Sequence, residues 1–190
     1  MSLSRPLKDR SKDVAVLDAT IRLLAVEGLA RMSMDRVAAE AGVSKVTVYT
    51  RWRSKAELIG AALTHLQIDH VPTPSGVLRD DLVAHLDAMR RQYDEVGGMA
   101  IVGNCLADEP VSGELLATIR RSTLLPRREN LAVVIRSGVE RGEFVAGADV
   151  QRLVSALLGS LYADHLAGRP VGPDWAAGVV DAVLPAFLAR

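Results

Sequence analysis

The stretch that decides the fold runs from Ser33 to Lys55 and reads SMDRVAAEAGVSKVTVYTRWRSK. Within it, Ala38, Gly42 and Val48 have the spacing of two short helices joined by a tight turn. A side chain larger than Ala38 would push the crossing helices apart, Gly42 can adopt the left-handed backbone of the turn, and Val48 projects back into the small core. This spacing predicts a helix-turn-helix unit.

Capping signals mark where the neighbouring helices begin and end. Ser33 and Ser44 are the predicted N-caps of the two helices of the unit. Ser54 caps the next helix, and Glu57, three residues later, completes a capping box. Gly28 is predicted to end the helix that precedes the unit, as a C-terminal glycine does. The preceding helix then supplies a third apolar face for the small core.

Helical periodicity continues through the chain, and no stretch alternates as a strand does. Besides the two helices of the unit and the helix from Ser54 to about Asp69, apolar stripes at helical spacing cover residues 14–25, 78–96, 99–106, 115–139, 150–165 and 175–187. The helix at 115–139 is expected to be interrupted or kinked near Pro126. The pattern predicts an all-α protein of about nine helices, with an N-terminal three-helix domain and a larger helical C-terminal domain.

The clearest break in the chain is His70–Gly76, where two prolines and a glycine cannot continue a helix. It predicts a first domain at 1–70 and a second at 76–190. Within the first domain, residues 1–12 form a basic arm and the helix-turn-helix occupies about 33–52.

Charge changes sign near the same boundary. The whole chain has 23 Lys and Arg against 23 Asp and Glu, but residues 1–60 carry 11 basic and 7 acidic side chains, and residues 61–190 carry 12 and 16. An excess of positive charge in the first part alone favours an anionic partner for that part.

Composition sets the class of protein. Hydrophobic residues make up 49% and charged residues 24% of the 190, as in folded globular proteins. The single cysteine, Cys105, cannot form an internal disulfide, which fits a reducing compartment. No apolar stretch reaches membrane-spanning length, and the opening MSLSRPLKDRSKD lacks the apolar core of a secretory signal. We therefore expect a cytoplasmic protein without membrane contact.

The second helix of a helix-turn-helix enters the major groove of DNA with its N-terminal residues first. Val48 and Trp52 face inward, which leaves outward the residues Lys45, Val46, Thr47, Tyr49, Thr50 and Arg51. A lysine can donate to guanine and a valine can contact a thymine methyl, while hydroxyls suit phosphate oxygens. Lys55, in the first turn of the next helix, can share a phosphate with backbone N–H groups. The candidate DNA-contacting residues are Ser33, Ser44, Lys45, Val46, Thr47, Tyr49, Thr50, Arg51 and Lys55.

These residues also carry a family resemblance. The run from Gly28 to Leu58, with AAEAGVSKVTVY at 38–49 and WRSK at 52–55, resembles the N-terminal domain of the TetR (tetracycline-repressor-like) transcriptional regulators. The resemblance covers about residues 12–62. It implies that Lys45, Val46 and Tyr49 approach the bases, and that Thr47, Tyr49 and Lys55 hold the DNA backbone. The remainder, Gly76–Arg190, resembles the C-terminal domain of one branch of the family, which implies a ligand cavity among its middle helices and dimerisation by its last two long helices.

The stripe at 150–165 supports dimerisation from its own residues. It is wide, and Ala156, Gly159, Ser160 and Ala163 are small enough for another helix to approach closely. The alternative is that the stripe packs only against its own core. The candidate dimer-interface residues are Val150, Leu153, Val154, Leu157, Leu158, Leu161, Trp175, Val179 and Val183.

Candidate ligand-binding residues combine polar tips or soft side chains with apolar helix faces, as pockets for small molecules do. They are His85, Met89, Tyr93, Met99, Asn104, Cys105 and Tyr162. For each of them the alternative is an ordinary place in the core. Because the middle helices carry apolar stripes and few charges, a hydrophobic effector is expected.

Three functions remain in competition. The leading hypothesis is a homodimeric DNA-binding regulator, a repressor that binds a palindromic operator and is released by a small hydrophobic ligand. An all-α enzyme with a helix-turn-helix corner is opposed by the lack of paired catalytic residues and of phosphate-binding glycine motifs. A non-specific DNA-binding protein is opposed by the acidic second half. We expect no metal and no cofactor, since the cluster of His65, Asp69 and His70 matches no metal-site spacing.

Overall fold

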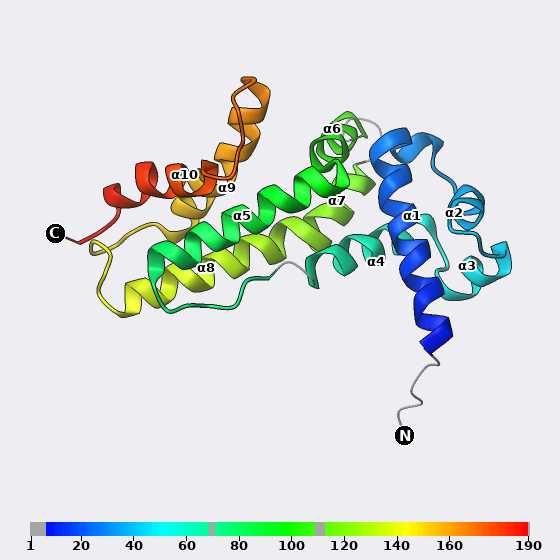
Figure 1. The fold of residues 1–190 in the computed structure, drawn as a ribbon, viewed down its shortest axis with the longest axis horizontal. Coiled ribbons are helices and arrows are strands. Elements are labelled where there is room, and N and C mark those ends of the chain that lie inside the picture. The colour runs from blue at the N-terminus through cyan, green and yellow to red at the C-terminus, as the bar shows by residue number, and fades with distance from the viewer. Residues whose placement is uncertain (1–6, 69–70, 109–112, 190) are drawn as a thin grey trace. The chain divides into compact units, whose positions relative to one another are not determined.

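The computed structural model describes residues 7–68, 71–108 and 113–189 (Figure 1). Over these ranges the chain forms ten α-helices: α1 (Leu7–Arg31), α2 (Met34–Glu40), α3 (Lys45–Arg51), α4 (Lys55–Ile68), α5 (Leu78–Val96), α6 (Gly98–Asp108), α7 (Glu114–Ile119), α8 (Leu125–Glu140), α9 (Val150–Leu166) and α10 (Trp175–Val183). The predicted all-α class is confirmed. No helix within the described ranges is both long and apolar enough to span a membrane.

Two breaks in the helices lie near prolines. The helix predicted at 115–139 is interrupted near Pro126: α7 and α8 are separated by a π-helical turn at Arg120–Leu124, and Pro126 lies in the first turn of α8. The last helix ends at Val183 and continues as a 3-10 turn, Leu184–Ala186, which contains Pro185.

The first helix is longer than its apolar stripe. Residues 7–12 of the expected basic arm belong to α1, and residues 1–6 lie outside the described ranges. Gly28 interrupts α1 with φ 72° and ψ 176°, and a last turn follows to Arg31. The backbone of Gly28 is not helical, so the regular helix ends at Gly28 as predicted and a separate turn follows to Arg31.

Packing divides the chain into two compact units that cut across the sequence. Unit 1 contains Met1–Ile68 and Glu95–Thr123, and unit 2 contains Asp69–Asp94 and Leu124–Arg190. In unit 1, α1 packs against α2, α4 and α6, while α7 packs against α4 and α6. Figure 1 shows α2 and α3 joined by their tight turn beside α1. Unit 1 thus combines the helix-turn-helix with two helices from the middle of the sequence.

Unit 2 is built around α5 and α8, which lie side by side (Figure 1). They approach closely at Gly138 of α8, where an added Cβ would lie 2.7 Å from the Phe144 ring and 3.3 Å from Leu78. Helix α9 packs on α8, and α10 packs on α9. The chain end returns to the turn after α8, where the N–H of Val145 donates to the carbonyl of Phe187 (2.9 Å).

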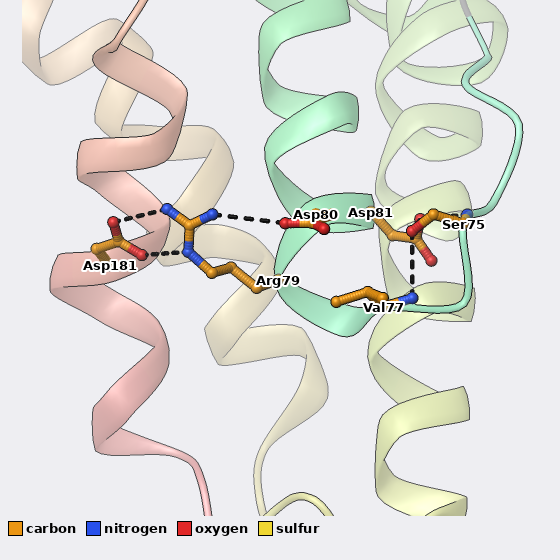
Figure 2. Close-up of polar contacts among 6 residues, drawn as sticks. All are labelled: Ser75, Val77, Arg79, Asp80, Asp81 and Asp181. Carbon is orange, nitrogen blue, oxygen red and sulfur yellow. Dashed lines mark hydrogen bonds and ion pairs between the residues drawn. The ribbon is translucent and has the colours of Figure 1, made fainter.

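A buried carboxylate fixes the start of α5. Asp81 is 7% exposed, and its Oδ1 accepts from the backbone N–H (2.6 Å) and the hydroxyl (2.7 Å) of Ser75, which lies beside it in Figure 2. Its Oδ2 accepts from the N–H of Gly76 (3.1 Å). Burial raises the pKa of Asp81, but these hydrogen bonds outweigh burial and hold the pKa below its usual range. The carboxylate therefore ties the segment before α5 to the helix in its ionised form.

A second contact of this region joins α5 to α10. The Arg79 guanidinium donates to both carboxylate oxygens of Asp181, at 2.7 and 2.8 Å (Figure 2). The same contact holds the pKa of Asp181 below its usual range. Both side chains are about half exposed, so the pair contributes little to stability.

We expect Asp81→Asn to lower the free energy of unfolding by about 1–3 kcal/mol at pH 7, because an amide cannot accept all three hydrogen bonds. The stabilisation from a carboxyl whose folded pKa is lowered is present above its unfolded pKa of about 3.9 and is lost as pH falls through the folded pKa. Denaturant unfolding of wild type and variant should therefore differ at pH 7, and the difference should shrink as the pH falls below about 3.9. The matched control is Asp80→Asn, whose carboxylate is 59% exposed; an equal loss in both variants would contradict the assignment.

Candidate DNA-binding surface

The helix-turn-helix forms as its spacing predicts. Ser33 caps α2, its Oγ accepting from the N–H of Arg36 (3.2 Å). Gly42 takes φ +64°, the left-handed backbone that favours glycine. Ala38 is 1% exposed and Val48 is not exposed at all, so these two side chains form the small core between α2 and α3.

The hydroxyl side chains at the start of α3 and along it form hydrogen bonds within the helix-turn-helix. The Oγ of Ser44 caps α3 by accepting from the N–H of Thr47 (3.1 Å), and it shares a second hydrogen bond with the Thr47 hydroxyl (2.9 Å). The Thr50 hydroxyl donates to the carbonyl of Val46 (2.6 Å). These three residues, predicted to contact DNA, first serve to hold the recognition helix in shape.

Two apolar or aromatic side chains of α3 have no place in the core. Val46 is 74% exposed and Tyr49 is 51% exposed, on the face away from Val48. An exposed valine in the first turn of a recognition helix can contact a thymine methyl in the major groove. The structure places both residues on the outer face of α3, as the sequence predicts.

Asp35 of α2 binds both polar tips of the outward face of α3. The Lys45 ammonium lies 2.5 Å from Asp35 Oδ2, and the Tyr49 hydroxyl donates to Oδ1 at 3.2 Å. The hydrogen bond from Lys45 holds the pKa of Asp35 below its usual range, and the same carboxylate raises the pKa values of Lys45 and Tyr49. Asp35 lies in the first turn of α2, and the helical pattern of the sequence does not predict its contact with α3. The opposite charges of Asp35 and Lys45 across the turn were the signal for this contact.

Arg51 faces inward, which corrects the sequence interpretation. Its side chain is 13% exposed and forms an ion pair with Asp13 of α1, and its Nη1 donates to the carbonyl of Thr47 (3.3 Å). Trp52 is 8% exposed, as predicted. Because α1 packs against the unit, the carboxylate of Asp13 draws the last arginine of α3 away from the outer face.

Lys55 joins α4 to the end of α1. Its ammonium donates to the carbonyl of Leu29 (2.8 Å) and to the carbonyl of Met32 (3.2 Å). Two of its three N–H groups therefore cap carbonyls at the C-terminal end of α1. Beside it, the Oγ of Ser54 accepts from the N–H of Glu57 (3.1 Å), and the Glu57 carboxylate accepts from the N–H of Arg53 (2.8 Å). The predicted capping box is present, with Glu57 reaching one residue further back.

The candidate ligand-binding residues fall into both units. Unit 1 holds Met99, Asn104 and Cys105; unit 2 holds His85, Met89, Tyr93 and Tyr162. Asn104 donates to the carbonyl of Leu24 in α1 (3.1 Å), and the buried thiol of Cys105 donates to the carbonyl of Ile101 (2.9 Å). These two side chains have local structural partners in unit 1.

Two of the candidates in unit 2 come together. The hydroxyls of Tyr93 and Tyr162 lie 2.7 Å apart, and their rings meet edge to face with centroids 5.9 Å apart. Arg127, which sequence reasoning missed, lies over the Tyr93 ring at 5.4 Å and donates to Gln92. His85 instead faces its own helix, with Nδ1 2.8 Å from the carbonyl of Asp81. No signal near Arg127 distinguished it from a solvated arginine after Pro126.

The candidate dimer-interface residues separate into buried and half-buried groups. Within the protomer Leu153, Val154, Leu157, Leu158, Leu161 and Trp175 are at most 9% exposed, and Val150, Val179 and Val183 are half-buried. By contrast, a Cβ added at Gly159 of α9 or Gly178 of α10 would meet nothing within 4 Å. The large side chains thus fill the core of unit 2, and the small residues lie outside.

Helix, left-handed turn and an outward recognition helix define a helix-turn-helix DNA-binding protein. Residues 16–62 match the family model of the tetR family of bacterial regulatory proteins, and residues 72–183 match the tetracyclin repressor-like C-terminal domain. The second match alone spans more than half of the chain. The chain belongs to the TetR family of transcriptional regulators, whose members are DNA-binding regulators and not enzymes.

Relatives match along nearly the whole chain. The HTH-type transcriptional regulator Rv1556 of Mycobacterium tuberculosis is 33% identical over 182 residues, covering 94% of this chain and 89% of the relative. A DNA-binding transcriptional repressor, TetR of Mycobacteroides abscessus, is 32% identical over 184 residues, covering 93% and 94%. The crystal structure of the TetR family transcription regulator SCO0332 is 31% identical with a TM-score of 0.70, covering 92% and 97%.

We expect Lys55→Ala to lower the free energy of unfolding by about 1–3 kcal/mol, because two carbonyls at the end of α1 lose a charged donor. The matched control is Lys45→Ala, whose ammonium is exposed and pairs with a surface carboxylate, so its loss should leave the stability almost unchanged. Denaturant unfolding measures both. Equal stability of the two variants would show that the Lys55 hydrogen bonds do not hold the helices together.

We expect Asp35→Asn to strengthen binding to all double-stranded DNA, because Lys45 loses its internal anion and a carboxylate leaves the DNA-facing surface. The slope of log affinity against log salt concentration should steepen by about 0.9 for one added phosphate contact. Fluorescence anisotropy with specific and random duplexes at several salt concentrations measures this slope. The control is Glu40→Gln, since Glu40 pairs with Arg22 at 3.5 Å. Weaker binding by Asp35→Asn would instead mean that Asp35 positions Lys45 for base contact.

Proposed function

We propose that this regulator is a homodimeric repressor whose two α3 helices read a palindromic operator and which a small hydrophobic ligand releases from DNA. The observation that carries the DNA-reading role is the outer face of α3, where Val46 and Tyr49 are exposed and Lys45 lies beside them. An apolar side chain and an aromatic ring held in water at the start of a recognition helix gain contacts only in a groove.

Base contacts are assigned to the first turn of α3. Val46 contacts a thymine methyl, and Lys45 leaves Asp35 to donate to guanine O6 and N7. Phosphate contacts are assigned to Ser33, Ser44, Thr47, Thr50, Tyr49 and the third N–H of Lys55. Arg51 is left out of this set because its ion pair with Asp13 takes it inward.

Two similar proteins and a linkage argument support the proposal of a repressor that a ligand releases. The M. abscessus relative is a transcriptional repressor, and SmeT, 16% identical with a TM-score of 0.67, has been solved as a complex with triclosan. For this chain, a ligand of the C-terminal region (residues 76–190) weakens operator binding only if it prefers the state that does not fit the operator. A coupling of about 1–3 kcal/mol gives a several-fold to hundred-fold loss of affinity. Because its partner is the chromosome, such a bacterial regulator acts in the cytoplasm.

The test of the proposed function is selection of operator sequences from a random pool of double-stranded DNA by the full-length protein. Enrichment of a palindrome with half-sites one helical turn apart, about 34–36 Å, is the expected result. Lys45→Ala should then lose preference at one base position in each half-site, by about 1–3 kcal/mol. Recovery of DNA without any enriched sequence would favour a non-specific DNA-binding protein, and recovery of none would exclude the proposal.

The dimer is proposed to form through the outer faces of α9 and α10. Gly159 and Gly178 lie there with open space around them, and Ala156 and Ala163 are exposed on the same helix as Gly159. Small residues let a second copy of the two helices approach closely. The buried leucines of α9 support these faces from within.

We expect Gly159→Glu to give a folded monomer, because its side chain enters open space in the protomer but a crowded seam in the dimer. Leu157→Glu should instead unfold unit 2, since Leu157 is fully buried. The control is Gly103→Glu in α6, another helical glycine with nothing within 4 Å of an added Cβ. Sedimentation velocity with circular dichroism separates these results; a wild-type monomer, or dimers of Gly159→Glu, would contradict the proposed interface.

A further inference from the structure

Arg127 is set apart from the other arginines of unit 2 by its lack of a carboxylate partner. Among the described residues, no carboxylate lies within ion-pair distance of Arg127. In the same unit, seven arginines each pair with an aspartate or glutamate: Arg79, Arg90, Arg91, Arg136, Arg141, Arg152 and Arg169. Arg128, the next residue, donates to Ser155 (3.1 Å) and Gln151 (2.8 Å) at the surface. Arg127 therefore brings a positive charge inward without an anion to balance it.

A buried hydrogen-bond donor at this site lacks an acceptor. The Nη1 atom of Arg127 is fully enclosed and has no acceptor within the part of the chain that the structure describes. Tyr93 and Tyr162 share one hydrogen bond between their hydroxyls, in which only one of the two hydroxyl protons takes part. Burial raises the pKa of Tyr93, which keeps its hydroxyl protonated and able to donate. A buried donor without an acceptor costs free energy unless a ligand or water supplies one.

The guanidinium is held in a fixed orientation before any ligand arrives. Its Nη2 donates to Gln92, which is 3% exposed, and its plane lies over the Tyr93 ring. Met89, one turn before Tyr93 on α5, is 2% exposed. The Arg127 guanidinium therefore lies among aromatic and apolar side chains of α5, α8 and α9.

We propose that this site binds the carboxylate of a small monocarboxylic acid with an apolar body, Arg127 Nη1 and a tyrosine hydroxyl donating to its oxygens. The inference rests on the proposed ligand-release function and narrows the effector from any hydrophobic molecule to a hydrophobic acid. A carboxylate matches the planar fork of a guanidinium and supplies the missing negative charge. The aromatic rings and Met89 suit the apolar part of such an acid.

The experiment uses matched pairs of probes that differ only in charge: benzoate and benzamide, 1-naphthoate and 1-naphthamide, cinnamate and cinnamamide, octanoate and octanamide. Thermal unfolding and isothermal titration calorimetry of the full-length protein measure binding. At least one acid should raise the melting temperature while its amide does not. Arg127→Met should weaken that acid by at least about tenfold, and the matched control, Arg128→Met, should bind it as wild type does.

A structural role for Arg127 predicts a different result without ligand. If Arg127 only supports the fold, Arg127→Met lowers the melting temperature of the ligand-free protein by several degrees. If Arg127 instead binds an anionic ligand, the melting temperature of the ligand-free variant is unchanged or higher. The inference is overturned by a loss of several degrees, by equal binding of acids and amides, by acid binding that survives Arg127→Met, or by a panel in which no acid binds. Operator binding of the ligand-free wild type is measured in parallel. If it is intact while acids fail, only this inference is lost, whereas its absence removes the proposed function itself.

Discussion

The Lys55 ammonium carries the constraint on which the DNA-binding surface depends. By donating to the carbonyls of Leu29 and Met32 it ties the first turn of α4 to the last turn of α1. Helix α2 begins directly after this junction, at Met34, and α3 follows across the turn at Gly42. A core as small as the one between Ala38 and Val48 cannot fix the direction of α3 alone, so α3 takes its direction from the two helices that Lys55 joins.

Contacts inside the protomer reduce the positive charge that the first third of the chain can offer to DNA. Three basic side chains of the helix-turn-helix region have partners inside the protomer: Lys45 pairs with Asp35, Arg51 pairs with Asp13, and Lys55 caps α1. A surface whose cations are partly balanced binds random DNA less tightly, because non-specific affinity depends on the phosphates that are neutralised. Under the proposed function, an operator has to offer Lys45 a better partner than Asp35, and the outer face of α3 would favour sequence reading over general attraction to DNA.

The sequence predicted what local signals determine and missed what distant contacts determine. The caps at Ser33, Ser44 and Ser54 and the turn at Gly42 each need only a few neighbouring residues, and the structure has all of them. The inward turn of Arg51 depends on Asp13, 38 positions earlier in α1, and periodicity along α3 carries no trace of it. Arg127 was missed for the opposite reason, because what distinguishes it is a missing partner. The DNA-contacting and ligand-binding roles themselves stay predictions.

Helix α9 shows why hydropathy alone could not separate core from interface. Its apolar stripe was open to two interpretations, a dimer seam or the protomer's own core, and both use leucines at helical spacing. The structure buries Leu153, Leu157 and Leu161 inside unit 2, which answers the question for the large side chains. What remains outside is marked by small size, as at Gly159, where an added side chain meets only open space. In such a helix, the large apolar residues mark the face that packs in the protomer core. The small residues on the opposite face mark where another helix can approach closely, which is where the dimer seam is proposed.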